Sequence, residues 1–362
     1  MFKNKRFISL VIIFILISSL LFGCNHQKTN GEVNANESLE VEDMAGRKIS
    51  IPAKVDRIFS VDPVGTILLY SLNPDKMAGW NYELREGEKR FIGEKYQGLP
   101  NLGDAGKETI NIEELLKVDP EALIMVTKID DSTLSKVDEL EKQTGKAIVV
   151  LDYNMKRLDE AYEILGEIMD EEDKAKELAK YCKKTLDEIR KNSSKIIEEK
   201  KMNIYYAEGP DGLQTEPAGS WHVQVIDMIG GRNVAQVEVK GEKGKSEVSI
   251  EQVLAWDPDI IISWDDERGG YYSEIYKDSN WKDIKAVKNR EVYEIPNKPF
   301  NWFDRPPSIN RILGLKWLGN LLYPDVYNYD MRNEVKEFYD KFYHYKLSED
   351  EIDELLQNST RH

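Results

Sequence analysis

An internal repeat constrains the fold of this chain more than any other feature of its sequence. Residues 111–126 read NIEELLKVDPEALIMV, and residues 249–264 read SIEQVLAWDPDIIISW. Ile-Glu, a Leu, Asp-Pro and an Ile recur in register in the two segments. Because a repeat of this kind marks a duplicated structural unit, we expect two similar lobes.

Each copy of the repeat predicts a helix followed by a strand. Asn111 and Ser249 are typical N-cap residues, and Glu114 or Gln252, three positions further on, would complete a capping box. Asp-Pro ends each helix, because the residue before a proline avoids the helical conformation. The short apolar, β-rich run that follows predicts a buried strand.

Other short apolar runs extend the same scheme, and they predict strands at 57–61, 77–80, 147–151, 203–207 and 291–295. Helical stretches separate most of them, which predicts parallel sheets with crossover helices. Residues 158–200 lack proline and contain one glycine, so we expect a short helix followed by a long one. The predicted fold class is α/β, with two similar Rossmann-like lobes joined by a long rigid backbone helix and a ligand cleft between the lobes.

The N-terminal segment has the layout of an export signal. Lys3, Lys5 and Arg6 precede an apolar and serine-containing run over residues 7–22, which is short for a membrane span. The run ends in Leu-Phe-Gly-Cys, which resembles a bacterial lipobox, so Cys24 is the predicted lipidation site. An uncleaved single-span anchor stays open as the alternative. Either way, the folded part is expected at the extracytoplasmic face of the cell membrane.

The charge and cysteine content exclude other classes of protein. The chain has 66 acidic and 50 basic residues, a formal net charge of −16. Such a surface repels nucleic acid and anionic lipid, so no nucleic-acid partner is expected. Two cysteines, Cys24 and Cys182, cannot form a disulfide framework. Cys182 is interpreted as a small helix residue.

These patterns divide the chain into six expected segments, each with a distinct role. They are a signal peptide (1–23), a flexible tether (24–38), an N-terminal α/β lobe (39–157), a linking helical segment (158–200), a C-terminal α/β lobe (201–345), and a C-terminal helix and tail (346–362).

The sequence resembles the bacterial substrate-binding proteins for iron-siderophore complexes and cobalamin, from about Leu39 to Pro324. The residues that carry the resemblance are Asp56-Arg57-Ile58 before Pro63-Val64-Gly65-Thr66, Leu99-Pro100-Asn101-Leu102-Gly103, the two repeats, and Gly230-Gly231-Arg232-Asn233-Val234. The resemblance implies a periplasmic-binding-protein fold and a monomer that catalyses no reaction. It would deliver a metal chelate to an ABC permease, whose ATPase supplies the energy.

The residues that follow the predicted strands are candidate ligand contacts, because ligands of open parallel sheets bind beyond the carboxyl ends of the strands. They are Trp80, Tyr82, Tyr153, Trp221, His222, Trp264, Trp302, Phe303 and Arg305. Such a set suits a bulky, partly apolar and partly anionic ligand. The alternatives are lobe packing for the aromatic residues, bracing of its own loop for Arg305, and capping or packing for His222.

The histidine content bears on metal binding. The chain has four histidines, and of these only His222 falls in a predicted cleft loop. This argues against a bare zinc or manganese site of the three-histidine kind. If His222 binds metal, it would coordinate an ion already held by a chelator. No cofactor is expected. A ferric siderophore ranks first as ligand, ahead of a nickel or cobalt chelate, cobalamin, haem and oxyanions such as molybdate.

Glu113 and Glu251 occupy equivalent positions in the two predicted repeat helices. In the resembled family, one surface glutamate per lobe docks on the permease, and these two match by motif. The alternative is that acids simply favour helix N-termini.

Two rival functions were weighed. An enzyme is disfavoured because dinucleotide and phosphate-loop motifs are absent, and no glycine follows Ser220 as a nucleophile elbow requires. A surface adhesin or scaffold, the other rival, would need neither duplicated lobes nor aromatic loops.

Overall fold

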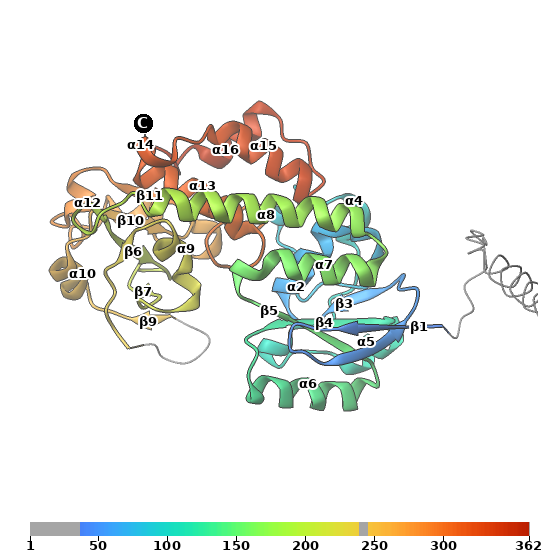
Figure 1. The fold of residues 1–362 in the computed structure, drawn as a ribbon. Coiled ribbons are helices and arrows are strands. Elements are labelled where there is room, and N and C mark those ends of the chain that lie inside the picture. The colour runs from blue at the N-terminus through green and yellow to red at the C-terminus, as the bar shows by residue number, and fades with distance from the viewer. Residues whose placement is uncertain (1–36, 239–244, 362) are drawn as a thin grey trace, which may run out of the picture. The chain divides into compact units, whose positions relative to one another are not determined.

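The computed structural model describes residues 37–238 and 245–361. The expected signal peptide, Cys24 and nearly all of the expected tether lie outside these residues. Residues 38–362 form one compact unit that contains two separate parallel sheets. Figure 1 shows these sheets at opposite ends of the long helix α8 (Glu172–Ser193).

The N-terminal sheet has the strand order β3-β4-β5, and all of its pairs are parallel. The strands are β3 (Ile58–Ser60), β4 (Ala122–Thr127) and β5 (Ile148–Asp152). The predicted strand 77–80 forms isolated bridges instead, from Met77 to Ile58 and from Trp80 to Asn101. Helices α2 (Pro63–Leu72), α5 (Ile112–Val118) and α6 (Asp131–Thr144) connect the strands. An unpredicted antiparallel hairpin, β1 (Ser38–Glu42) and β2 (Lys48–Pro52), precedes them.

The C-terminal sheet has the order β11-β10-β6-β8, again with parallel pairs only. Its strands are β6 (Asn203–Ala207), β8 (Arg232–Asn233), β10 (Ile260–Ser263) and β11 (Val292–Glu294). Two very short strands, β7 (Gln214–Thr215) and β9 (Ser246–Glu247), pair separately. Shorter helices in this half are α9 (Gln224–Met228), α10 (Ile250–Trp256), α11 (Tyr272–Ile275) and α12 (Lys285–Lys288).

Both repeats form the predicted helix and strand, α5–β4 and α10–β10. Asn111 caps α5 through the backbone N–H of Glu114, and Ser249 caps α10 through that of Gln252. The full capping box forms only at Ser249. At Asn111 it does not form, because the Glu114 carboxylate lies 3.4 Å from Lys117 Nζ instead.

The predicted short and long helices between the sheets are α7 (Leu158–Met169) and α8, and they pack together. Cys182 is fully buried on α8. Helix α13 (Asn310–Leu322) packs against α8 and is buried on nearly all sides, so its first turn lies inside the molecule. Helices α14 (Pro324–Tyr327), α15 (Met331–Phe342) and α16 (Glu349–Leu356) follow, and Ser348 and Glu351 form the predicted capping box at α16. Two short helices, α3 (Glu86–Lys89) and α4 (Glu94–Gln97), complete the N-terminal lobe.

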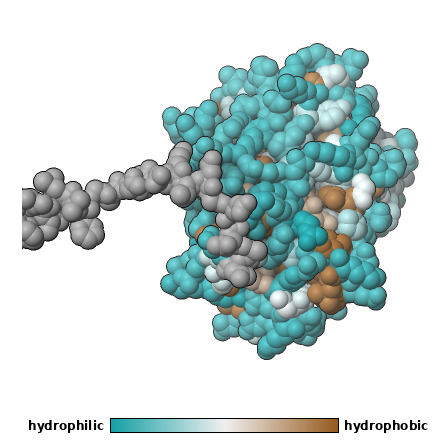
Figure 2. Space-filling model, turned by 90° about the vertical axis from the view of Figure 1, so that its right-hand side faces the viewer, coloured by the Kyte–Doolittle hydropathy of each residue, from teal (hydrophilic) through white to brown (hydrophobic). Residues whose placement is uncertain are grey.

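Within residues 37–238 and 245–361, no helix is long and apolar enough to cross a membrane. The face shown in Figure 2 is mainly hydrophilic, with small hydrophobic patches.

Candidate functional site

A group of buried charged side chains lies where the strands of the C-terminal sheet end. Glu208 directly follows β6, Glu216 and His222 lie in the loop that continues from it, and Asp304 and Arg305 lie in the loop after β11. Glu208, Glu216 and Asp304 are fully buried, and His222 is 5% exposed. These five residues are called the charged cluster below.

Arg305 is held by all three carboxylates of the cluster. Its Nη2 donates to Glu216 Oε1 at 2.5 Å and to Glu208 Oε1 at 3.1 Å. Its Nε lies 3.1 Å from Asp304 Oδ2. Burial lowers the pKa of this guanidinium, but the neighbouring Asp304 and Glu208 charges outweigh burial and raise it above the ordinary arginine value. Arg305 is therefore already compensated by charges of the protein itself.

Asp304 connects the cluster to the aromatic residues. The Tyr206 hydroxyl donates to Asp304 Oδ1 at 2.7 Å, and Trp264 Nε1 donates to that hydroxyl at 2.5 Å. Asp304 Oδ2 lies 3.2 Å from His222 Nδ1. Burial raises the pKa of Asp304, whereas Arg305 and His222 lower it, and the net shift is downward, so the carboxylate stays ionised.

Glu208 differs from Asp304 in its protonation. Burial, followed by the nearby Asp304 charge, raises the pKa of Glu208 to about 8, although Arg305 opposes the shift. Its Oε2 has no hydrogen-bond partner among the described residues. At neutral pH Glu208 therefore holds a proton, and the cluster carries less negative charge than its composition indicates.

Arg311, in the first turn of α13, is buried without a carboxylate partner. It is 1% exposed, and none of the described residues forms a salt bridge with it. Its guanidinium donates to two backbone carbonyls, that of Trp221 at 3.2 Å and that of Tyr153 at 3.4 Å, and its Nε has no partner within the described ranges. Burial lowers its pKa to about 10, although the charge of Asp304, which does not contact it, opposes the shift, so Arg311 remains a cation at neutral pH.

Arg311 also lies where the two lobes meet. Tyr153 follows β5 of the N-terminal sheet, and Trp221 belongs to the C-terminal lobe, yet their rings are 4.8 Å apart. The guanidinium carbon of Arg311 lies 5.9 Å from the centre of the Trp221 ring. Both rings are partly exposed. A ligand between the lobes would thus meet two aromatic surfaces beside a guanidinium that no described carboxylate contacts.

Trp264 is the centre of a second group of cations. Lys245 Nζ lies 4.2 Å from its ring centre, and the guanidinium carbons of Arg268 and Arg305 lie at 5.9 and 5.8 Å. Burial lowers the pKa of both Lys245 and Arg268.

Three of the predicted contact residues lie in the lobe interiors. Trp80 is 2% exposed and donates its Nε1 to the Tyr96 carbonyl at 2.8 Å, whereas Trp302 and Phe303 are fully buried. Phe303 packs against Tyr206 with ring centres 4.7 Å apart. In this structure the three residues serve lobe packing, which is the alternative stated for aromatic residues above. Their role as ligand contacts stays a prediction.

The remaining predicted contacts lie at or near the junction of the lobes. Tyr82 is partly buried and donates its hydroxyl to Glu88 at 3.1 Å, while Tyr153, Trp221, His222, Trp264 and Arg305 lie as described above. Sequence reasoning did not select Glu208, Glu216 or Arg311. Glu208 could have been found, because it directly follows a predicted strand. Arg311 had no such signal, since it reads as an ordinary helical residue.

The two predicted docking glutamates are exposed on the first turns of α5 and α10. Glu113 Oε1 lies 3.2 Å from Lys117 Nζ, four residues further along the same helix. An exposed pair of this kind contributes little to stability, so it leaves Glu113 available to a partner.

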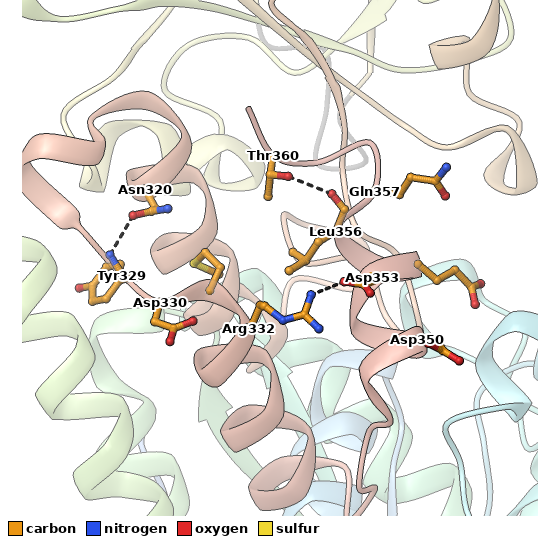
Figure 3. A pocket seen from close by; sticks show the side chains of 11 residues that line it. Asn320, Tyr329, Asp330, Arg332, Asp350, Asp353, Leu356, Gln357 and Thr360 are labelled. Atoms are coloured by element: carbon orange, nitrogen blue, oxygen red, sulfur yellow. Dashed lines mark hydrogen bonds and ion pairs between the residues drawn. The ribbon is translucent and has the colours of Figure 1, made fainter. Parts of the chain in front are cut away.

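A cavity of about 740 Å³ lies between the end of α13 and helices α15 and α16. Figure 3 shows Arg332 within it, directed at Asp353. Arg332 also contacts Glu349 at 2.5 Å. Because this cation is already paired and the lining is otherwise acidic or neutral, the cavity offers no equivalent of the unpaired Arg311.

Two parallel α/β sheets joined by the long helix α8 thus flank the junction where Arg311 contacts the carbonyls of Tyr153 and Trp221. The family model described as "Periplasmic binding protein" matches residues 95–299, more than half of the chain. The chain belongs to this family, and both the predicted family resemblance and the predicted α/β fold class are confirmed.

Known proteins resemble this chain over nearly its whole length. The solved structure of an ABC transporter solute binding protein from Sulfurospirillum deleyianum has a TM-score of 0.81 and 29% identity, covering 88% of this chain and 99% of that one. The molybdate-binding protein MolA of Haemophilus influenzae is 25% identical over 90% of this chain and 96% of its own length. The ABC transporter substrate-binding lipoprotein YvrC of Bacillus subtilis is 22% identical over 86% of this chain and 96% of its own length.

Proposed function

We propose that this chain is the lipid-anchored substrate-binding component of an ABC importer, and that its cargo is a compact, metal-containing anion held between the lobes. The observation that carries the proposal is Arg311, a fully buried guanidinium with only neutral carbonyl partners. Burying an unpaired charge costs several kcal/mol, whereas an anion placed beside it would offset that cost.

The aromatic surroundings favour a small cargo. Trp80, Trp302 and Phe303 are buried in the lobes, so less aromatic surface is available to a bulky ligand than the sequence indicated. A metal oxyanion such as molybdate would need only a few donors at fixed positions, and a guanidinium suits such oxygen atoms well. The name of the H. influenzae relative agrees with this class of cargo.

A ferric siderophore or another anionic ferric chelate is the second candidate. The partly exposed rings of Tyr153 and Trp221 favour it, because they offer a stacking surface beside Arg311. Other relatives are named for such cargoes: the ferric-citrate-binding protein YfmC of B. subtilis, 19% identical, and the haem-uptake protein IsdE of Staphylococcus aureus, 23% identical. Nickel or cobalt chelates and cobalamin rank below these.

The rest of the proposal concerns delivery. Cys24 would carry the lipid that holds the protein at the outer face of the membrane, in keeping with the name of the lipoprotein relative. Glu113 and Glu251, one in each lobe, would dock as a monomer on basic residues of the permease. His222 could then contact the metal of a bound chelate. The chain itself would catalyse no reaction, since its relatives are solute-binding proteins.

The test is a ligand panel followed by tryptophan fluorescence and thermal unfolding. The panel contains molybdate, ferric citrate, hydroxamate and catecholate siderophores, haem, cobalamin and a nickel-histidine complex. We expect one anionic member to bind saturably and the Arg311→Met variant to bind it at least about a hundredfold more weakly, a loss typical of a buried charge-assisted contact. Arg232→Met is the matched control, because Arg232 is an exposed arginine of β8 that pairs with Glu198. Preference for a neutral or cationic member, or equal binding by both variants, would refute the proposal.

A further inference from the structure

Three side chains of the charged cluster offer metal ligands that the sequence did not place together. Glu216, His222 and Asp304 each present one ligand atom, and these atoms lie within 4.8 Å of one another. Glu216 and Asp304 are fully buried, and His222 is nearly so. The two loops that carry them follow different strands, and more than 80 residues separate Asp304 from His222 in sequence. A count of histidines therefore could not reveal the site.

Unmet hydrogen-bonding capacity in the trio points to a ligand. Only 5% of the His222 surface is exposed, yet neither of its ring nitrogens makes an aligned hydrogen bond with a described residue. Oδ2 of Asp304, 3.2 Å from His222 Nδ1, also lacks such a bond. Buried polar atoms are seldom left unpaired, so these atoms point to a bound species that both nitrogen and oxygen atoms can coordinate. A first-row divalent ion does so.

The local charge favours a cation as the occupant. The carboxylates of Glu216 and Asp304 contact one guanidinium, that of Arg305, so the acidic groups outnumber the cation even without Glu208. An ion bound to the trio would replace the contact between Arg305 Nε and Asp304 Oδ2 and the hydrogen bond from Ser220 to Glu216 Oε2. Arg305 Nη2 could keep its hydrogen bonds to Glu208 Oε1 and Glu216 Oε1. Glu216 Oε2, which accepts a hydrogen bond from Ser220 at 2.9 Å in this structure, would bind the metal instead.

We propose that Glu216, His222 and Asp304 form a binding site for a divalent transition-metal ion of the cobalt, nickel or zinc type, in competition with Arg305. One imidazole and two carboxylates are a ligand set that these ions accept, and solvent or a cargo atom would complete the coordination sphere. This proposal can be tested separately from the proposed anionic cargo, because the titration uses the metal ion alone.

The first experiment is a titration of the metal-free, untagged full chain with Co²⁺, followed by visible absorption and calorimetry. We expect one ion per chain and a spectrum of low coordination number. His222→Gln and Asp304→Asn should each bind Co²⁺ at least about tenfold more weakly. His344→Gln, which alters an exposed histidine outside the trio, is the matched control and should bind as the unaltered chain does. No Co²⁺ spectrum in the unaltered chain, or equal weakening by His344→Gln, would overturn the proposal.

A third variant tests the proposal in the opposite direction, because it should bind the metal more tightly. Arg305→Met removes the competing guanidinium, so Co²⁺ should bind at least about tenfold more tightly and raise the unfolding temperature by more than it does in the unaltered chain. If Arg305 instead organises the trio for some other purpose, Arg305→Met would weaken or abolish Co²⁺ binding. That result would overturn the proposal even if the anion panel succeeds.

Discussion

Both sheets carry polar side chains at their carboxyl ends, but the two lobes use them differently. In the N-terminal lobe, Asp62 accepts hydrogen bonds from the backbone of Gly65 and Val126, and Asn81 donates to the Ser60 and Gly103 carbonyls. Within the described part of residues 38–157, no buried side-chain nitrogen or oxygen lacks a hydrogen-bond partner.

Among the described residues, every buried side-chain nitrogen or oxygen atom that lacks a hydrogen-bond partner belongs to the C-terminal lobe, and Glu208 is the first residue to carry one. Most belong to the charged cluster and its neighbours, Arg311 among them. Because an unpaired buried polar atom costs free energy, such atoms mark sites that are shaped for something other than stability. Under the proposed function, the N-terminal lobe would act mainly as a scaffold and the C-terminal lobe would hold most of the binding groups.

The largest expected effect is the destabilisation of the C-terminal lobe by Arg305→Met. This change leaves the Glu216 and Asp304 carboxylates and the buried Glu208 without their shared cation, and removal of one partner from a buried charge group typically costs about 3–5 kcal/mol. Urea unfolding at neutral pH, without added metal, measures the loss. A change below about 1 kcal/mol would mean that the cluster is not held together by Arg305.

The N-terminal counterpart is Asp62→Ala. It removes the N-cap of α2 and leaves the buried N–H of Val126 without an acceptor, so we expect a loss of about 2–4 kcal/mol. Cargo affinity should stay within about twofold of the unaltered chain, because these bonds serve structure alone. Titration of the cargo found by the panel checks this. A tenfold loss of affinity in a folded Asp62→Ala protein would contradict the proposal that the C-terminal lobe holds most of the binding groups.

A smaller effect is expected in the pH dependence of stability, and Glu208→Gln isolates it. The pKa of Glu208 is raised to about 8 in the folded chain, mainly by burial, from an ordinary value of 4.5. The folded state therefore holds a proton that the unfolded state has lost between those values. Glu208 should thus stabilise the fold increasingly as pH falls from about 8 toward 4.5, by at most about 1.4 kcal/mol per unit.

Unfolding free energies of both proteins, measured at about pH 5 and pH 9, test this sign. The difference in unfolding free energy between the unaltered chain and Glu208→Gln should shift in favour of the unaltered chain from about pH 9 to about pH 5, by on the order of 3 kcal/mol. Asp62, whose pKa burial raises to about 7, is present in both proteins, so its contribution cancels from the difference. Parallel profiles for the two proteins would show that Glu208 is charged at neutral pH.

Local features of the fold were predictable from sequence, because caps and periodicity act over a few residues. The helix caps at Ser249 and Ser348 formed as expected, as did the helices α7 and α8. The segment 77–80 was predicted as a strand, but it forms only isolated bridges. A side chain at Gly79 would collide with Leu102 and the Pro100 carbonyl, so the segment runs close to its neighbour and forms only isolated bridges.

The site was less predictable, because distant loops build it. The position after a strand correctly placed Trp221, His222 and Arg305 near the junction of the lobes, but it could not tell that Trp302 turns inward. Arg311 lies within a helix, and its importance arises only because α13 is buried between the lobes. Partnership is a tertiary property, so no sequence pattern separates a paired arginine such as Arg305 from the unpaired Arg311.

The proposed function requires that no carboxylate contacts Arg311 until a cargo anion arrives, and the stability of Arg311→Met tests this requirement. The unfolding free energy of Arg311→Met is compared with that of the unaltered chain, without any ligand. Since an isolated buried charge is replaced by an apolar side chain of similar length, the account predicts equal or greater stability, by up to about 4 kcal/mol. A loss of about 3 kcal/mol or more would contradict it, because Arg311 would then be a structural cation that the fold already satisfies.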